Sequence, residues 1–247
     1  MAVDENTELT LIDHLLELRR RLIWIMAVLL VCFLILVPFA QKIYTFVAAP
    51  LMSNLPEGTH MIATDVIAPF FVPIKVTLMV AFLLTLPHTL FQIWKFVAPG
   101  LYRHEKRLIF PLMVSSLALF ALGMAFAYFL VFPVIFRFLA GVTPDGVNMA
   151  TDIDKYLSFI LGMFMAFGVT FEVPVVVILL NKIGVVNIQQ LYKARPYIIV
   201  LAFIIAAIVT PPDVLSQTLL AIPLILLYEI GILICRVLGK ANHVRDA

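Results

Sequence analysis

The chain has 247 residues, of which 63% are hydrophobic and 13% charged, and its mean hydropathy is +1.09. Average soluble domains carry about 25% charged residues, so this composition excludes a soluble globular protein. The apolar residues form runs of membrane-spanning length, about 20 residues for a helix. These runs are too long and too uniformly apolar for the strands of a membrane barrel. The sequence therefore predicts an all-α integral membrane protein.

The first predicted element is an amphipathic helix within residues 1–21, with apolar residues at positions 11, 12, 15, 16 and 18. This spacing places the apolar side chains on one helical face, so the helix is expected to lie at the membrane surface and to turn inward at Leu22. Three arginines and the apolar run 22–37 follow, a pattern that also occurs in secretory signal peptides. Because an acidic amphipathic helix precedes the run, we interpret it as an uncleaved first span.

Five further spans are predicted, separated by turns and charged segments. With the N-terminus inside, the cytosolic segments hold 13 of the 17 basic residues, and this asymmetry predicts that both termini are cytosolic. The whole chain 1–247 is predicted to form one six-span domain. Its spans after the first cover about residues 73–91, 108–136, 156–180, 197–209 and 216–238, with an outer cap loop at 41–72, a cytosolic loop at 92–107 and a cytosolic tail at 239–247.

Two features suggest the shape of the bundle. Proline occurs in or beside every span, which predicts kinked helices that together form a concave face. The fifth span has only about 13 apolar residues, or about 20 Å of helix, against a hydrocarbon core of about 30 Å. Spans five and six therefore either thin the bilayer locally or are sheltered within the bundle. Ala-Thr-Asp occurs at both 63–65 and 150–152, and we interpret both copies as helix N-caps.

The loop at 92–107 is the densest polar segment of the chain. It holds four basic residues, one carboxylate at Glu105 and the aromatic residues Phe96 and Tyr102. Cations alone would be sufficient to set the topology, so the carboxylate and the aromatics suggest a binding surface. The alternative is that Glu105 only neutralises a neighbouring cation in a solvated pair, worth under about 1 kcal/mol.

Two carboxylates fall inside predicted spans. Glu172 lies several residues into span four, where a charge costs on the order of 2.5–3.5 kcal/mol, so it is expected to face the bundle or a hydrated cavity. It either contacts a substrate or responds to protons, or it is a protonated group bonded to a neighbouring helix. Glu229 lies close to the cytosolic end of span six and is expected to reach the interface or to pair with Arg236.

Patterns of enzyme chemistry are missing from the sequence. No phosphate-binding loop of the G-x-x-x-x-G-K-[ST] type occurs, and His104-Glu105 is not followed by the second histidine of a zinc protease. No span combines a serine nucleophile with a deep histidine, and His88 is interpreted as a helix-packing residue. We therefore expect neither enzyme activity nor a cofactor, and energy supplied by an ion gradient or by a partner.

Short motifs from one end of the chain to the other resemble the TatC family, the receptor subunit of the twin-arginine protein translocase. Their order and spacing carry the resemblance. They are HLLELRRR at 14–21, APL at 49–51, MIATD at 61–65, PFF at 69–71, FVAPGLYRHE at 96–105, GMAFAYF at 123–129, AFGV at 166–169, FEVP at 171–174, RPY at 195–197 and TPPDVLSQ at 210–217.

The resemblance implies roles for residues at the cytosolic face and within the bundle. Glu17 and Glu105 match glutamates that contact the twin-arginine motif of signal peptides, and carboxylates pair bidentately with guanidinium groups. Arg19 and Phe96 match positions needed for the same receptor surface. Glu172 matches a polar residue on the concave face, where the apolar part of the signal peptide is expected to insert.

At the outer face, the resemblance implies that Pro50 and Asp213 are required for transport. It also implies that Thr210 and Gln217 help to dock the single-span partners TatA and TatB. The expected function is protonmotive-force-driven transport of folded proteins across the bacterial inner membrane by a complex containing several copies of this chain, without a nucleic-acid partner. The alternative is a proton-coupled secondary transporter of a small solute, which would bring several charged residues together at mid-membrane, whereas only Glu172 qualifies.

Overall fold

A computed structural model describes residues 11–52, 61–97, 109–142, 151–210 and 213–245. Within these residues the fold is helical, apart from one pair of two-residue strands. Six helical segments of the described chain are long and apolar enough to span a membrane, which confirms the predicted fold class. These segments are His14–Ala48, Ala68–Phe96, Phe110–Phe138, Ile153–Lys182, Ile188–Val209 and Val214–Val237.

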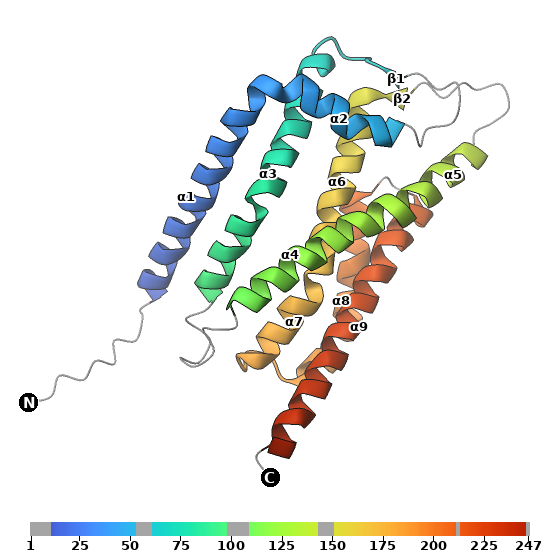
Figure 1. Ribbon diagram of the computed structural model, residues 1–247. Coiled ribbons are helices and arrows are strands. Elements are labelled where there is room, and N and C mark those ends of the chain that lie inside the picture. The colour runs from blue at the N-terminus through green and yellow to red at the C-terminus, as the bar shows by residue number, and fades with distance from the viewer. Residues whose placement is uncertain (1–10, 53–60, 98–108, 143–150, 211–212, 246–247) are drawn as a thin grey trace, which may run out of the picture.

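The first span differs from the prediction at its start. Helix α1 (Leu11–Leu36) is continuous through Leu22, so no separate surface helix turns inward there. Leucine and arginine are both strong helix formers, and no breaker separates the amphipathic segment from the apolar run. The chain bends later, at the 3₁₀ turn η1 (Val37–Phe39), which has a proline in its first turn. Helix α2 (Ala40–Met52) then crosses the end of the bundle as part of the predicted cap (Figure 1).

Helix α3 (Ala68–Val97) lies beside α1 and accommodates two prolines in its interior. The next span is built from α4 (Ile109–Phe126), a π-helical turn η4 (Ala127–Val131) and α5 (Phe132–Val142). The π-helical turn lies directly before Pro133, which has no N–H to donate to the carbonyl of Phe129. The irregularity in this span therefore has a local cause in the sequence.

A second proline interrupts the fourth span. Helix α6 (Ile153–Phe171) ends at Glu172, and α7 (Val173–Lys182) begins directly after it with Pro174 in its first turn. Because Pro174 has no N–H, the Thr170 carbonyl loses its usual partner four residues on. At the same break, the Glu172 backbone N–H bonds to the Val169 carbonyl, three residues back, at 3.1 Å. The break places the predicted intramembrane glutamate at the junction of two helices.

The fifth span is longer than its apolar run predicts. Helix α8 (Ile188–Val209) has 22 residues, or about 33 Å. It begins with a capping box, in which Asn187 and Gln190 exchange hydrogen bonds of 2.8 Å. Its first turns carry Lys193 and Arg195, long cations that reach the membrane surface. Helix α9 (Val214–Arg245) packs along α8 and α7 and continues into the segment predicted as a tail.

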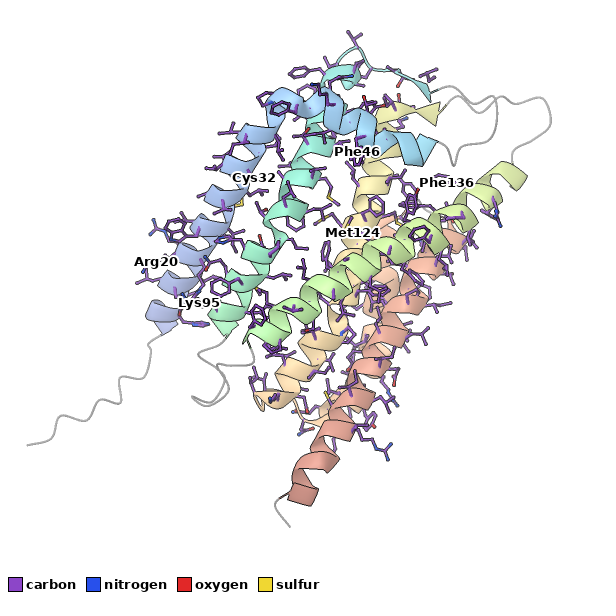
Figure 2. The ribbon with its side chains drawn as sticks, in the orientation of Figure 1. Arg20, Cys32, Phe46, Lys95, Met124 and Phe136 are labelled. Atoms are coloured by element: carbon purple, nitrogen blue, oxygen red, sulfur yellow. The ribbon has the colours of Figure 1, made fainter. Side chains whose placement is uncertain are left out.

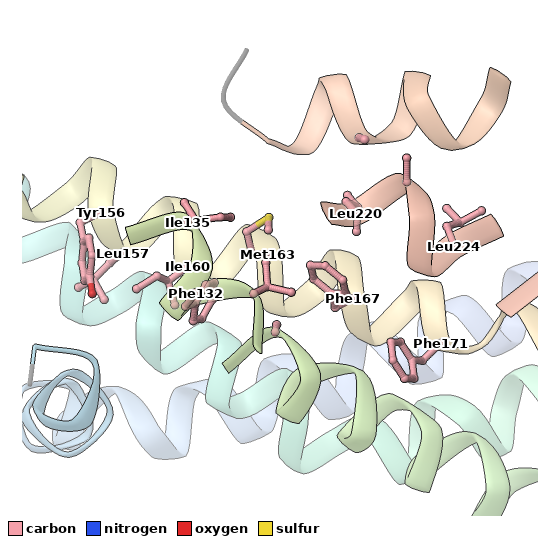
Figure 3. Packing of buried hydrophobic residues seen from close by; sticks show 14 of the residues in the cluster. Phe132, Ile135, Tyr156, Leu157, Ile160, Met163, Phe167, Phe171, Leu220 and Leu224 are labelled. Atoms are coloured by element: carbon pink, nitrogen blue, oxygen red, sulfur yellow. The ribbon is translucent and has the colours of Figure 1, made fainter. Parts of the chain in front are cut away.

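The core is organised on α6. Its buried side chains form a row along the helix and contact α3, η4, α5, α8 and α9 (Figure 3). Helix α4 crosses α6 at two glycines, Gly123 and Gly168. A Cβ atom at Gly123 would lie 2.9 Å from the carbonyl carbon of Phe167 and closer still to its oxygen, and one at Gly168 would lie 2.5 Å from the ring of Phe120. Small residues therefore set the distance between these helices.

The two Ala-Thr-Asp segments contact each other across the cap. Strand β1 (Met61–Ile62) pairs in parallel with β2 (Thr151–Asp152). The Asp152 carboxylate accepts hydrogen bonds from the Thr64 hydroxyl and, at 3.0 Å, from the Thr64 N–H. Its other oxygen caps α6 by accepting from the N–H groups of Asp154 and Lys155, each at 3.0 Å. Asp152 is thus the N-cap that its motif predicts, and it also fastens β1 to the start of α6.

The hydrogen bond from the Thr64 hydroxyl, followed by those from the N–H groups of Lys155 and Thr64, lowers the pKa of Asp152 to about 2. A carboxyl with a lowered pKa stabilises the folded state above its unfolded pKa, and this contribution is lost as the pH falls through the folded value. We expect the contact between Thr64 and Asp152 to be intact at pH 5 and to weaken between about pH 4 and pH 2. Hydrogen exchange at the Thr64 amide, followed from pH 5 to pH 2, measures this loss.

The matched variant is Asp65→Asn, which removes a carboxylate from the same exposed segment without touching Asp152. This variant should keep the acid-induced loss of protection at Thr64, whereas Asp152→Ala should lack protection at every pH. Protection at Thr64 that is independent of pH in the unmodified chain would show that the ionised carboxylate does not hold the two strands.

Candidate functional site

Three of the predicted receptor residues, Glu17, Arg19 and Phe96, lie at the end of the bundle where α1 begins and α9 ends, which we call the base (Figure 1). There Glu17 binds Arg21, one helical turn along α1, through the Nη2 and Nε atoms of the guanidinium, with Nε at 3.1 Å. Nη1 of Arg21 donates to Gln92 on α3 at 3.3 Å. The amide of Gln92 in turn lies 3.4 Å from Nε2 of His88. These contacts link α1 to α3 through a chain of polar groups.

A polar cavity of about 460 Å³ lies beside this chain of contacts, between α1 and α3. Glu17, Arg20, Arg21 and Trp24 line it from α1, and His88, Gln92 and Lys95 line it from α3. Arg20 and Lys95 lie at the same end of the two neighbouring helices (Figure 2). The cavity therefore combines one carboxylate with three cations at the base.

The other predicted receptor residues are placed as follows. Arg19 is exposed on α1. Phe96, near the end of α3, stacks on the ring of His14, with centroids 4.4 Å apart and planes 22° apart. The structure thus brings Glu17, Arg19 and Phe96 to the base on two adjacent helices. Glu105 lies outside the described residues.

Glu172 stands apart from the base, at the break between α6 and α7. Its Oε1 atom is buried and has no hydrogen-bond partner within the described part of the chain. Ser116 Oγ on α4 is likewise buried without a partner of ordinary hydrogen-bond geometry among the described residues, and it lies beside the Glu172 carboxyl. An unpaired polar atom in the bundle costs about 1–3 kcal/mol, so this position is suited to a partner or water that supplies the missing hydrogen bond.

Two apolar cavities adjoin each other along α6 and share Gly162 and Met165. One, of about 380 Å³, extends toward α1 and α3 and contacts Leu29 and Phe82. The other, of about 490 Å³, extends toward α8 and α9 and contacts Val209. Together they form an apolar depression along α6; Glu172, expected on the concave face, lines neither cavity, but its neighbour Val173 lines the second.

Three of the residues predicted for the outer face, Thr210, Asp213 and Gln217, lie where α8 meets α9. Thr210 is buried and donates to the Ala206 carbonyl at 2.8 Å. Asp213 Oδ1 accepts from the Ser216 N–H at 2.7 Å and so caps α9, and the Gln217 N–H bonds to the Asp213 carbonyl at 3.2 Å. Pro50 lies within α2. Asp213 therefore has a structural role at this turn, whatever else it does.

The expected partner of Glu229 was wrong. Glu229 on α9 accepts from Arg195 on α8 at 2.5 Å, and the Arg195 guanidinium also lies 4.5 Å from the ring centroid of Tyr192. Arg236, seven residues further along α9, is exposed. The pair forms because α8 and α9 pack along each other, a tertiary contact that spacing on one helix does not indicate.

Three residues at the base were missed as site residues: Arg21, Gln92 and His88. The signal for both contacts was present, since Glu17 and Arg21 are four residues apart, as are His88 and Gln92, and such pairs face each other on a helix. His88, which we interpreted from the sequence as a helix-packing residue, lines the polar cavity. Nothing in the sequence indicated that Gln92 approaches Arg21, which lies 71 residues earlier.

Known proteins resemble the chain over nearly its whole length. Residues 13–223 match the family model described as TatC, Sec-independent protein translocase protein. The TatC of Escherichia coli strain K12 is 55% identical over 244 residues, covering 98% of this chain and 94% of that protein. The Haemophilus influenzae TatC is 53% identical over 234 residues, covering 95% and 91%.

A solved structure agrees with these relatives. The crystal structure of a twin-arginine translocase receptor, TatC, superposes with a TM-score of 0.81 at 42% identity, covering 91% of this chain and 98% of that one. The family model, the relatives and the solved structure therefore all indicate one family, and the sequence motifs are consistent with it. This chain belongs to the TatC family of Sec-independent protein translocase proteins, multi-pass proteins of the inner membrane.

Proposed function

We propose that this chain is the receptor and core component of a twin-arginine translocation system, with the base and both termini on the cytosolic side. In this proposal Glu17 and Glu105 bind the two arginines of a signal peptide, and Arg19 and Phe96 complete the receptor surface. One observation carries the proposal: Glu17, which lines a polar cavity, already binds a guanidinium, that of Arg21. The carboxylate is therefore oriented so that a planar guanidinium can bind it, and an ammonium group does not reproduce that planar geometry.

The apolar part of the signal peptide would lie in the depression along α6. The apolar cavities there contact α1 and α3 on one side and α8 and α9 on the other. Val173, which follows Glu172, lines the second cavity, so a helix in the depression would pass close to Glu172. The unpaired Oε1 of Glu172 would then accept a hydrogen bond from the peptide or from water.

The remaining assignments concern transport and assembly. TatA and TatB would dock near Thr210 and Gln217, and Pro50 and Asp213 would support transport at the outer face. Several copies of the chain would assemble in the receptor complex, and the protonmotive force would drive folded proteins across the membrane. Because Thr210 is buried and bonded within α8, its part in docking would be to shape the surface near Gln217.

The test is binding of a fluorescent signal peptide to the protein in nanodiscs. Twin-arginine and twin-lysine peptides are compared on the unmodified chain, Glu17→Gln and Glu105→Gln. We expect the unmodified chain to prefer arginine by at least about tenfold, because a guanidinium pairs bidentately with a carboxylate whereas an ammonium binds it only as a point charge. Each variant should lose most of that preference.

Glu229→Gln is the matched control, since it also removes a carboxylate paired with an arginine at a helix surface. It should bind both peptides as the unmodified chain does. Equal binding of the two peptides by the unmodified chain would reject the receptor assignment for this face.

A further inference from the structure

The charges of the polar cavity between α1 and α3 are unevenly compensated. Arg21 is paired with Glu17, and its side chain is only 14% exposed. Arg20 and Lys95 form no ion pair with any residue that the structure describes, and both are exposed. Lys95 Nζ lies over the ring of Phe91, 5.8 Å from its centroid. The cavity thus presents two unpaired cations, one from each helix.

The apolar part of the same cavity lies deeper along α1. Trp24 follows Arg20 by four residues, so the two side chains share a face and the indole lies about one turn, or about 6 Å, further from the base. Trp24 is 54% exposed, as expected for an indole at the level where lipid headgroups meet hydrocarbon. From the base inward, the cavity therefore presents cations first and an amphipathic ring second.

This order of groups matches a phospholipid, in which a phosphate lies above glycerol and acyl chains. Basic pockets between transmembrane helices are known to bind anionic headgroups, and about 460 Å³ falls within the usual range for small-molecule sites, about 300–1,000 Å³. A zwitterionic headgroup carries its own ammonium, which would need a carboxylate. Among the described residues that line the cavity, Glu17 is the only carboxylate, and it is already paired with Arg21.

We propose that this cavity binds the headgroup phosphate of an anionic phospholipid, held by Arg20 from α1 and Lys95 from α3, with the Trp24 indole beneath it. The bound lipid neutralises two cations that would otherwise repel each other across the α1–α3 interface. The site shares its cavity with Glu17, the proposed signal-peptide residue, but it uses two different side chains, Arg20 and Lys95.

Trp24 provides a reporter for the test. The chain has two tryptophans, and the other, Trp94, is buried with an indole nitrogen that has no hydrogen-bond partner within the described residues. Trp94→Phe therefore removes its fluorescence without breaking a hydrogen bond. In this background, the protein is placed in nanodiscs that contain phosphatidylglycerol or phosphatidylcholine brominated near the top of the acyl chains, each diluted into unbrominated phosphatidylcholine.

We expect brominated phosphatidylglycerol to quench Trp24 at about one tenth of the mole fraction that brominated phosphatidylcholine requires, since each cation near an anionic lipid contributes severalfold. The double variant Arg20→Gln/Lys95→Gln should bring the two lipids to equal quenching. The control Lys193→Gln/Arg236→Gln removes two exposed cations from α8 and α9 and should retain the preference.

Three outcomes would overturn the proposal. Equal quenching by the two lipids in the Trp94→Phe protein would show that no preference exists, independently of any charge variant. A preference that survives in the Arg20→Gln/Lys95→Gln protein would place the lipid elsewhere. A preference abolished by inorganic phosphate at constant ionic strength would assign the cavity to a soluble anion. Thermal unfolding of each variant in the same nanodiscs checks that folding is unchanged.

Discussion

Alanine at position 123 is expected to destabilise the protein by about 3 kcal/mol, near the upper end of the usual cost of overpacking. The added methyl group meets the backbone carbonyl of Phe167, which cannot rotate away as a side chain does. Helix α4 must then move away from α6, and α6 carries the row of core side chains. Thermal unfolding in detergent, followed by the loss of the monodisperse peak in size-exclusion chromatography, measures the change.

Gly162→Ala is the control for this effect. Gly162 also lies in a spanning helix, α6, but a Cβ atom there meets nothing within 4 Å. Alanine favours a helix over glycine by up to about 1 kcal/mol, so this variant should be as stable as the unmodified chain or slightly more so. If Gly123→Ala and Gly162→Ala unfold at the same temperature, close approach at Gly123 does not determine how α4 packs on α6.

Arg21→Gln is expected to tighten binding of a twin-arginine peptide about tenfold, if Glu17 is a recognition residue as proposed. In the free protein, the Arg21 guanidinium occupies one carboxylate oxygen of Glu17 through two nitrogen atoms. An incoming arginine must displace or share that contact and must also approach the Arg21 charge. Glutamine removes both costs, and hydrogen bonds to charged groups contribute about 1.5–3 kcal/mol. Titration of the labelled peptide in nanodiscs gives the Kd.

The control Arg20→Gln distinguishes competition for Glu17 from general repulsion of the peptide's arginines by a nearby positive charge. It removes the same charge from the adjacent position but breaks no bond to Glu17, so its effect should be limited to the few-fold change expected from exposed charges. Weaker binding by Arg21→Gln would mean that Arg21 orients Glu17 for the peptide instead of competing with it.

Periodicity and charge predicted most of the fold. Runs of apolar residues located the six spans, and the prolines located two of the irregularities, at η4 and at Glu172. The start of α8 was misplaced because the apolar run begins only at Tyr197, whereas the capping box at Asn187 starts the helix ten residues earlier. A criterion based on hydrophobicity alone cannot locate a helix end that is set by hydrogen bonds.

The site was predictable where it depends on one helix and unpredictable where it depends on two. Glu17 and Arg21 pair within α1, so their i,i+4 spacing is enough to indicate the contact. The pairing of Thr64 with Asp152 spans 88 residues, and that of Arg195 with Glu229 joins two helices. Such contacts follow from how the helices pack, which no local pattern in the sequence specifies.

The exposure of α1 has a consequence for how the protein is made. None of the most apolar stretch of this span is buried against the rest of the described chain, whereas the span formed by α6 and α7 has the largest buried share. A ribosome releases α1 first, when no other part of the bundle exists to receive it. The nascent helix nevertheless depends little on later segments for cover, although α3 packs along one side of it in the finished protein. Helix α6 emerges after α3, α4 and α5, which cover part of it, and its cover is completed only when α8 and α9 follow.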